Sequence, residues 1–118
     1  MLQPEHRLTK PREFSVLYHH GSKEVGKHLV IYYLKKNQAV NRFGFIVSKK
    51  VGNAVVRNRI KRKLREIVRH HPVMHQKGFD MVLIARSNCV DADYQRIAAD
   101  AHALFARIGF SKESDFHD

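Results

Sequence analysis

The chain has 118 residues, a length that suits a single domain covering residues 1–118. Its 22 lysines and arginines against 11 aspartates and glutamates give a formal net charge of +11, which favours a polyanionic partner such as a nucleic acid. One cysteine, no apolar run of membrane-spanning length and no signal-peptide pattern at the N-terminus exclude an internal disulfide and a cysteine-based zinc site, argue against a membrane anchor and favour a cytoplasmic location.

The N-terminal part of the chain predicts a flexible arm and one short helix. Residues 1–10 are polar and basic, and we expect them, like residues 111–118, to be flexible. A helix is predicted from Pro11 to about His20, because Phe14, Leu17 and Tyr18 recur at helical spacing. Gly21 then ends the helix.

Two strands are predicted next. Leu29–Leu34 is rich in β-branched and aromatic residues, and Arg42–Ser48 alternates between an aromatic face and a face that carries Gly44 and Ser48. A turn-like stretch, 37–41, joins them, so we expect an antiparallel hairpin. The sequence does not decide whether Ser22–Val25 forms a strand of its own.

The most informative stretch is a basic helix that is predicted to run to about His71, where Pro72 stops it. Its apolar residues lie on one side of a helical wheel: Val56, Ile60, Leu64, Ile67 and Val68. Cations cover the rest: Arg59, Lys61, Arg62, Lys63, Arg65 and Arg69, with Arg57 near the edge of the apolar side but able to reach out from the first turn. Only Glu66 is acidic, so the cations repel one another unless a polyanion binds them.

The turn before this helix predicts a phosphate-binding corner. Lys49 and Lys50 follow a strand, Gly52 permits an unusual backbone angle, and Asn53 can cap the helix. The N-terminus of a helix adds free N–H donors and partial positive charge.

The C-terminal half adds a strand and a last helix. Phe79–Ala85 is almost continuously apolar, as in a strand that is covered on both faces, and follows a loop at 72–78. A helix is predicted over Asp91–Ile108, with Asp91 or Asp93 near its start and Gly109 at its end. The predicted fold is an α+β two-layer sandwich of order α-β-β-(β)-α-β-α, with helices packed on one mixed sheet.

The chemistry that the chain lacks is also informative. Its acids are scattered, whereas metal-dependent phosphodiester cleavage normally uses clustered carboxylates, so we expect no catalytic residue in this chain. His70 and His71 are adjacent and point about 100° apart on a helix, so they chelate poorly. We expect these two and His75 to be surface histidines, with no metal site.

The aromatic residues leave two interpretations open. Phe14 and Tyr18 share a helical face, which suits core packing. If Tyr32 and the Gly44/Ser48 strand face lie opposite, they could instead form a platform on which unpaired bases stack.

The stretch from Gly52 to Arg62 resembles the Arg-Asn-Arg signature of the bacterial ribonuclease P protein family, here Arg57-Asn58-Arg59, and the resemblance covers roughly His6 to Phe110. It implies a left-handed strand–helix–strand crossover, a catalytic RNA partner, precursor tRNA as substrate and Mg²⁺ held mainly by RNA. It implies that the protein assists removal of the 5′ leader of precursor tRNA as an accessory, non-catalytic subunit, with no membrane or small-molecule ligand. The residues that it places on the RNA subunit are Lys50, Arg57, Asn58, Arg59, Lys61, Arg62 and Arg65. The residues that it places on the leader are Phe14, Tyr18, Tyr32, Ser48, Lys49, Asn53 and Arg86, of which Asn53 stands where some relatives carry a cation.

A structural RNA-binding protein, such as a small ribosomal protein, is the alternative that fits the charge and the fold equally well. It does not explain the Phe14/Tyr18 pair beside Ser48 and Lys49. A DNA-binding helix-turn-helix protein and an autonomous nuclease fit less well.

Overall fold

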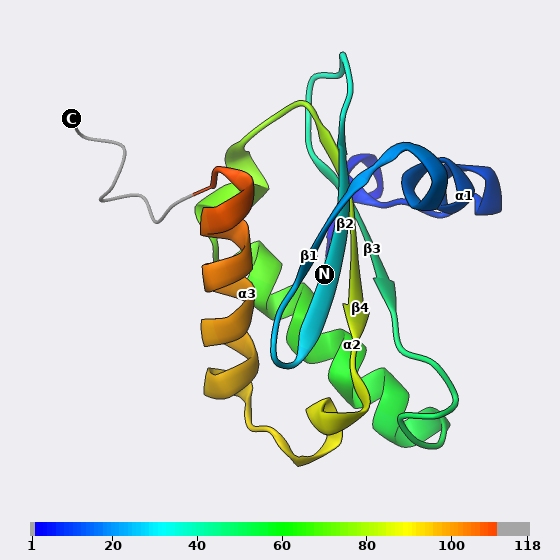
Figure 1. The fold of residues 1–118 in the computed structure, drawn as a ribbon, viewed down its shortest axis with the longest axis vertical. Coiled ribbons are helices and arrows are strands. Elements are labelled where there is room, and N and C mark those ends of the chain that lie inside the picture. The colour runs from blue at the N-terminus through cyan, green and yellow to red at the C-terminus, as the bar shows by residue number, and fades with distance from the viewer. Residues whose placement is uncertain (1, 111–118) are drawn as a thin grey trace.

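A computed structural model describes residues 2–110 of the chain (Figure 1). These residues form an α+β fold around one four-stranded sheet, as predicted. In chain order the elements are η1 (Pro4–His6), α1 (Pro11–His20), β1 (Ser22–Val25), β2 (Leu29–Lys35), β3 (Arg42–Ile46), α2 (Ala54–Arg69), η2 (Pro72–His75), β4 (Phe79–Ala85), η3 (Ser87–Asp91) and α3 (Tyr94–Ile108), where η marks a short 3-10 helix. None of the described helices is long and apolar enough to cross a membrane.

The sheet is mixed, with strand order β1-β2-β4-β3. The open question about Ser22–Val25 is settled, because this segment pairs antiparallel with β2 as the edge strand β1. The predicted hairpin between β2 and β3 is wrong: β4 lies between them, antiparallel to β2 and parallel to β3. Four consecutive β4 residues, 80–83, are buried, and a strand apolar on both faces is best accommodated in the middle of a sheet.

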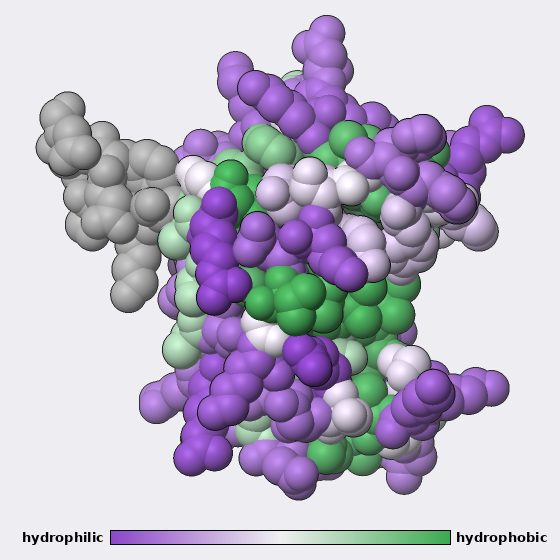
Figure 2. Space-filling model, viewed as in Figure 1, coloured by the Kyte–Doolittle hydropathy of each residue, from purple (hydrophilic) through white to green (hydrophobic). Residues whose placement is uncertain are grey.

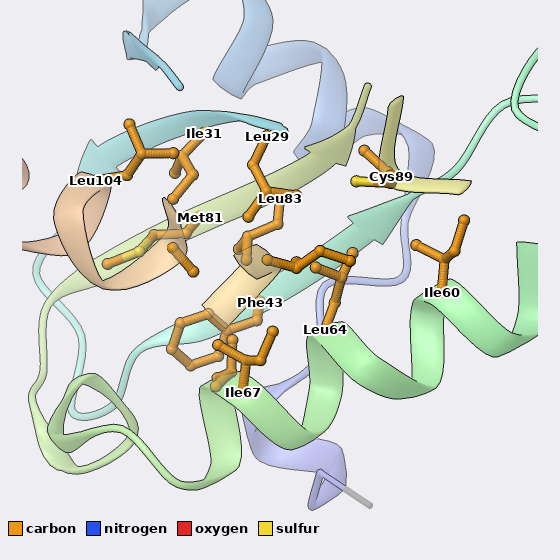
Figure 3. Packing of buried hydrophobic residues seen from close by; sticks show 14 of the residues in the cluster. Leu29, Ile31, Phe43, Ile60, Leu64, Ile67, Met81, Leu83, Cys89 and Leu104 are labelled. Carbon is orange, nitrogen blue, oxygen red and sulfur yellow. The ribbon is translucent and has the colours of Figure 1, made fainter. Parts of the chain in front are cut away.

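Helices cover both faces of this sheet. On one face, Ile60, Leu64 and Ile67 of α2 pack with the apolar stripe of α3 against the sheet residues Phe43 and Leu83 (Figure 3). On the other face lies α1, whose Leu17 packs against Val82 and Leu8. Because α1 has only ten residues, it covers one end of its face (Figure 1). β3 reaches its parallel neighbour β4 through α2, which is the expected strand–helix–strand crossover; its hand stays a prediction.

The N-terminal segment is packed, contrary to the expectation that residues 1–10 are flexible. Leu2 and Leu8 are 3% and 5% exposed. The Leu8 N–H donates to the Phe43 carbonyl at 2.9 Å, and His6 Nδ1 lies 2.9 Å from the Asn41 carbonyl oxygen. Two isolated leucines in a polar segment give no periodicity that sequence analysis could detect. The expectation for residues 111–118 lies outside the described residues.

Helix ends differ from the prediction by two or three residues, the usual uncertainty for sequence patterns. α2 ends at Arg69 rather than His71, and α3 starts at Tyr94 because Asp93, not Asp91, caps it by accepting the N–H of Arg96 at 2.9 Å. The loop after α2 contains η2, which begins directly after the buried His71 in the chain.

A carboxylate fixes the β1–β2 turn to α3. Asp100 accepts the backbone N–H groups of Lys27, His28 and Leu29 at 3.1, 2.8 and 3.0 Å. A Cβ on Gly26 would lie 2.7 Å from the Asp100 oxygens, so glycine at this position lets the carboxylate approach the three amides closely. The clamp holds β1, β2 and the last helix together.

Candidate nucleic-acid interface

The turn before α2 is built to start this helix at a fixed place. Asn53 caps α2, because its Oδ1 accepts the N–H of Val56 at 3.0 Å, as predicted. Val51 is buried and anchors the turn to the core. Gly52 is required for a different reason from the predicted one: its φ is not positive, but a Cβ would lie only 2.8 Å from Cγ1 of Val56.

α2 presents a ridge of cations to solvent. We call the cation ridge the residues Arg59, Lys61, Arg62, Lys63 and Arg65. The three arginines are exposed and the two lysines are half-buried. Within residues 2–110, no carboxylate lies within 4 Å of any of them, so the ridge is uncompensated. Such an arrangement repels itself in isolation and is stabilised by a bound polyanion.

Arg57 behaves differently from the ridge, although it belongs to the predicted site. It is half-buried, and its Nε donates to the carbonyl of Gly52 at 3.2 Å. The side chain therefore braces the turn as well as carrying charge. Asn58, beside it, is exposed and free to contact a ligand.

The cation ridge ends before Glu66, the only acidic residue of α2, which forms ion pairs of its own. Glu66 accepts from Arg69 at 2.9 Å and lies 3.1 Å from Nε2 of His70. The hydrogen bond from Arg69 is the main reason why the pKa of Glu66 is lowered. The C-terminal turn of α2 is thus self-compensated, and the uncompensated charge is confined to its first three turns.

The sheet face below α1 carries an open apolar strip. Pairing across the sheet aligns Val25 with Val30, Val30 with Ile84, and Ile84 with Ile46. We call these four residues the apolar row. Val25 is exposed and the other three are half-buried, because α1 stops short of them. In Figure 2 the corresponding side of the molecule is hollowed beneath α1, and its floor is apolar.

Two tyrosines border the apolar row on the α1 side. Tyr18 and Tyr32 lie edge to face with ring centroids 5.0 Å apart, and Tyr18 remains 41% exposed. Burial, followed by the influence of Tyr32, raises the pKa of Tyr18, so this phenol is neutral at physiological pH. Lys23 of β1 adds its Nζ 5.9 Å from the Tyr32 ring centroid. Sequence analysis missed Lys23, because the strand that positions it was left open.

Phe14 lies deeper than Tyr18. Its ring packs directly over Gly44, where a Cβ would lie 2.5 Å from Cε1. The predicted meeting of α1 with the Gly44 face of β3 is therefore present, and Gly44 is what permits it. Phe14 is half-buried, so it serves the core as well as the border of the open face.

The opposite border of the apolar row holds the remaining predicted residues. Ser48 and Lys49 are exposed immediately after β3, and Lys50 follows in the turn. Ser48 and Arg86 follow Ile46 and Ile84 by two residues, so they lie on the same face of the sheet as the apolar row. The Arg86 Nη1 donates to the Gly26 carbonyl at 3.0 Å, and the side-chain oxygen of Asn53 is used by the helix cap. The apolar row is thus bordered by tyrosines and by basic residues.

Most of the described acids are engaged in other contacts. Asp80 binds Arg42, Lys36 and Gln38, Glu13 binds Arg42, and Asp100 accepts three amides. Within residues 2–110, no three His, Cys, Asp or Glu side chains are grouped to share a metal ion.

The histidine expectation is wrong at one position. His70 and His75 are exposed, but His71 is only 3% exposed. Its Nδ1 accepts the N–H of Val73 at 3.0 Å, and the centroid of its ring lies 4.8 Å from the centroid of the Phe105 ring. His71 caps η2, a role that its place at the end of a predicted helix concealed.

Fold and surface together define a small basic α+β protein with a cationic helix beside a half-open sheet face. The family model of ribonuclease P matches residues 2–109. The chain is 38% identical over 109 residues to the ribonuclease P protein component of Syntrophomonas wolfei, with 92% of each chain covered. It is 41% identical over 96 residues to that of Alkaliphilus metalliredigens, covering 81% of this chain and 86% of the relative.

Solved structures agree with this relationship. The Staphylococcus aureus RNase P protein superposes with a TM-score of 0.81 at 30% identity, over 89% of this chain and 96% of that one. A second S. aureus structure, described as a mutant with defective mRNA degradation activity, has a TM-score of 0.80 at 30% identity and covers 90% of each chain. The chain belongs to the ribonuclease P protein family, whose members are protein components of a tRNA-processing ribonucleoprotein.

Proposed function

We propose that this protein is the accessory subunit of ribonuclease P, in which α2 binds the catalytic RNA subunit and the open sheet face binds the 5′ leader of precursor tRNA. Family membership supports an RNA partner in general. The division of labour between two surfaces is our inference. The observation that carries it is the uncompensated cation ridge next to the tyrosine-bordered apolar row.

The two surfaces suit two kinds of RNA contact. Phosphates in a folded RNA are bound by dense positive charge without regard to sequence, which the ridge provides. A single-stranded leader exposes its bases, and these stack on aromatic and apolar surface. The proposed contacts to the RNA subunit are Lys50, Arg57, Asn58, Arg59, Lys61, Arg62 and Arg65. The proposed contacts to the leader are Phe14, Tyr18, Tyr32, Ser48, Lys49, Asn53 and Arg86.

The protein would contribute binding rather than bond cleavage. Mg²⁺ supplies charge stabilisation for phosphodiester hydrolysis when bound, and we infer that RNA phosphates hold it, since most of the described acids of this chain are engaged elsewhere. The chain's own residues would neutralise RNA charge and hold the substrate's leader. This reduces the Mg²⁺ concentration that the complex needs.

The direct test is processing of precursor tRNA by the ribonuclease P RNA of the same organism at limiting Mg²⁺, with and without the protein. We expect the protein to accelerate release of the 5′ leader at low Mg²⁺ and to have little effect at saturating Mg²⁺. Equal rates with and without protein at every Mg²⁺ concentration would contradict the proposal. A protein in which Arg59, Arg62 and Arg65 are replaced by Gln serves as the binding-deficient control.

A further inference from the structure

A pocket of about 300 Å³ opens beside the outer edge of β3, and its lining extends to Phe14 and Gly44 on the α1 side of the sheet. It lies between the packed N-terminal segment, β3 and α2, and we call it the edge pocket. Its volume is at the lower limit of small-ligand sites, roughly 300–1,000 Å³. The residues that carry the argument are Leu2, Arg7, Thr9, Phe45, Lys61 and Arg65.

The edge pocket combines apolar walls with a cationic rim. Leu2 and Phe45 supply apolar surface, and Arg7, Lys61 and Arg65 surround it. Among the described residues, none of these three cations has a carboxylate within 4 Å. Arg7 is held by its Nε, which donates to the Leu2 carbonyl at 3.0 Å and leaves the other guanidinium nitrogens for a ligand. An apolar cavity with an uncompensated cationic rim suits a ligand that is flat at one end and anionic at the other.

The strand edge adds a hydrogen-bonding pair. The N-terminal segment covers the start of the outer edge of β3, since the Leu8 N–H donates to the Phe43 carbonyl and Arg7 forms a bridge with Phe43. Backbone groups of alternate residues point to the same edge of a strand, so the N–H and C=O of Phe45 also face outward. Phe45 lines the pocket, and its backbone offers one donor and one acceptor there.

We propose that the edge pocket receives one unpaired nucleotide of the RNA that binds along α2. The base would enter between Leu2 and Phe45, with its polar edge on the Phe45 backbone, and its phosphate would lie on the cationic rim. Lys61 and Arg65 belong to both the cation ridge and this rim, so an RNA strand on the ridge passes the mouth of the pocket. The proposal rests on the proposed function, because it names the RNA subunit as the source of the nucleotide.

An extended peptide that adds to β3 is the other occupant that a strand edge suggests. Two observations favour the nucleotide. The Leu8 N–H already donates to the Phe43 carbonyl, and β3 ends at Ile46. Only Phe45 therefore has free outward-facing backbone groups with which a peptide could pair. The three uncompensated cations of the rim favour an anion.

The test is to fill the edge pocket without changing its charge. Thr9 is exposed and lines the pocket, so Thr9→Trp places a large ring in it while the core stays intact. Gln3→Trp is the matched control, because Gln3 is exposed on the same segment and does not line the pocket. We expect Thr9→Trp to weaken affinity for the catalytic RNA about tenfold, the size of effect that losing one stacked base produces, and Gln3→Trp to have no effect.

Hydrogen exchange of the Phe45 amide is the second readout. In wild-type protein, binding of the catalytic RNA should slow this exchange, and in the Thr9→Trp complex the exchange should stay fast. Arg7→Gln should lower the salt dependence of binding by about one phosphate contact. Melting temperatures of all variants show whether each is folded.

The outcomes separate this proposal from the proposed function. If wild-type protein does not bind the catalytic RNA at all, the proposed function fails and the edge pocket proposal fails with it. If wild-type binds but Thr9→Trp binds equally well and Phe45 exchange is unchanged, only the edge pocket proposal is overturned. Retention of an acidic peptide in the pocket with no protection by RNA would also overturn it, in favour of a protein partner.

Discussion

Arg42 and Asp80 lie opposite each other on the parallel strands β3 and β4, and the guanidinium donates Nε and Nη2 to the two carboxylate oxygens at 2.9 Å each. Arg42 also binds Glu13 of α1 at 2.6 Å, and Lys36 reaches Asp80 at 3.2 Å. Asp80 is 2% exposed, so this pair fixes α1 to the sheet from inside. Through Glu13, it contributes to the placement of α1, and hence of Tyr18.

Asp80 should make stability fall at acid pH. Burial alone would raise the pKa of Asp80, but hydrogen bonds from Arg42, Gln38 and Lys36 outweigh it, and the pKa is lowered from its ordinary 3.8. When the pKa of a carboxyl is lower in the folded protein than in the unfolded chain, the ionised group stabilises the fold fully at pH values above the unfolded pKa. This stabilisation is lost progressively as the pH falls below about 3.8.

Asp80→Asn should therefore destabilise the protein by about 3 kcal/mol at neutral pH, at the low end of ~3–5 kcal/mol for breaking a buried pair, because Arg42 retains Glu13. Urea unfolding at pH 7 and at pH 3 is the measurement. The stability gap between wild type and variant should narrow at pH 3. Asp91→Asn, at an exposed position, is the control and should match wild type; a constant gap at both pH values would refute this account of Asp80.

The cation ridge should determine the salt dependence of RNA binding. Arg62→Gln removes an uncompensated charge, whereas Arg69→Gln removes one that Glu66 already compensates. We expect Arg62→Gln to lower the slope of log affinity against log salt by about one contact, and Arg69→Gln to lower it less. Binding to the catalytic RNA across a salt series measures both. Equal slopes for the two variants would mean that local compensation is irrelevant.

Gly52→Ala should disturb the start of α2. The new Cβ would lie 2.8 Å from Val56 Cγ1, so the turn or the first helical residues must shift. We expect a loss of about 1–3 kcal/mol, as for other overpacked sites, with weaker binding to the catalytic RNA. Asn58→Ala, at an exposed position of the same helix, should leave stability within about 0.5 kcal/mol. Thermal or urea unfolding compares the stabilities of the two variants. If Gly52→Ala is as stable as wild type, the close contact with Val56 relaxes without cost.

The isolated protein should not cleave RNA. Most of the described acids are held in ion pairs, caps and amide contacts, and within residues 2–110 no three of them are grouped to share a metal ion for hydrolysis. The assay incubates the protein with Mg²⁺ and either precursor tRNA or an mRNA, since a S. aureus relative is described by an mRNA degradation activity. Cleavage that co-purifies with the protein and disappears on an Asp→Asn change in this chain would disprove the expectation.

Local patterns predicted most of the elements, whereas pairing and burial required the structure. The helix period of α2 and the apolar run of β4 each located an element within about two residues. The neighbour of β3 was mispredicted because adjacency in sequence favours a hairpin, and only the need to bury both faces of β4 places that strand between β2 and β3. Leu2, Leu8 and His71 were missed because burial of single residues leaves no period.

The candidate site shows the same division. The cations of α2 were identified because their density is a property of the sequence alone. The apolar row and Lys23 were missed, because these residues become neighbours only through the pairing register of the strands, which the sequence does not reveal. Phe14 and Tyr18 looked equivalent in sequence, but the close approach of Gly44 draws Phe14 into the core and leaves Tyr18 exposed.

The exposed ring of Tyr18 gives the account its sharpest prediction. Tyr18→Leu keeps apolar volume but removes the flat surface, and it should weaken holoenzyme binding of precursor tRNA by about 1–3 kcal/mol if one leader base stacks there. Phe14→Leu should also lower stability, since its ring fills the space over Gly44. Val55→Ala, at an exposed position of α2 outside the open face, is the control.

The measurement that tests the central claim is the affinity of the reconstituted holoenzyme for tRNA with and without its 5′ leader, for wild type and Tyr18→Leu, beside the melting temperature of each protein. We predict that Tyr18→Leu weakens binding only of the tRNA that carries a leader, with an unchanged melting temperature and unchanged affinity for the catalytic RNA. Equal weakening for both tRNAs, or no weakening for either, would contradict the assignment of the open sheet face to the leader.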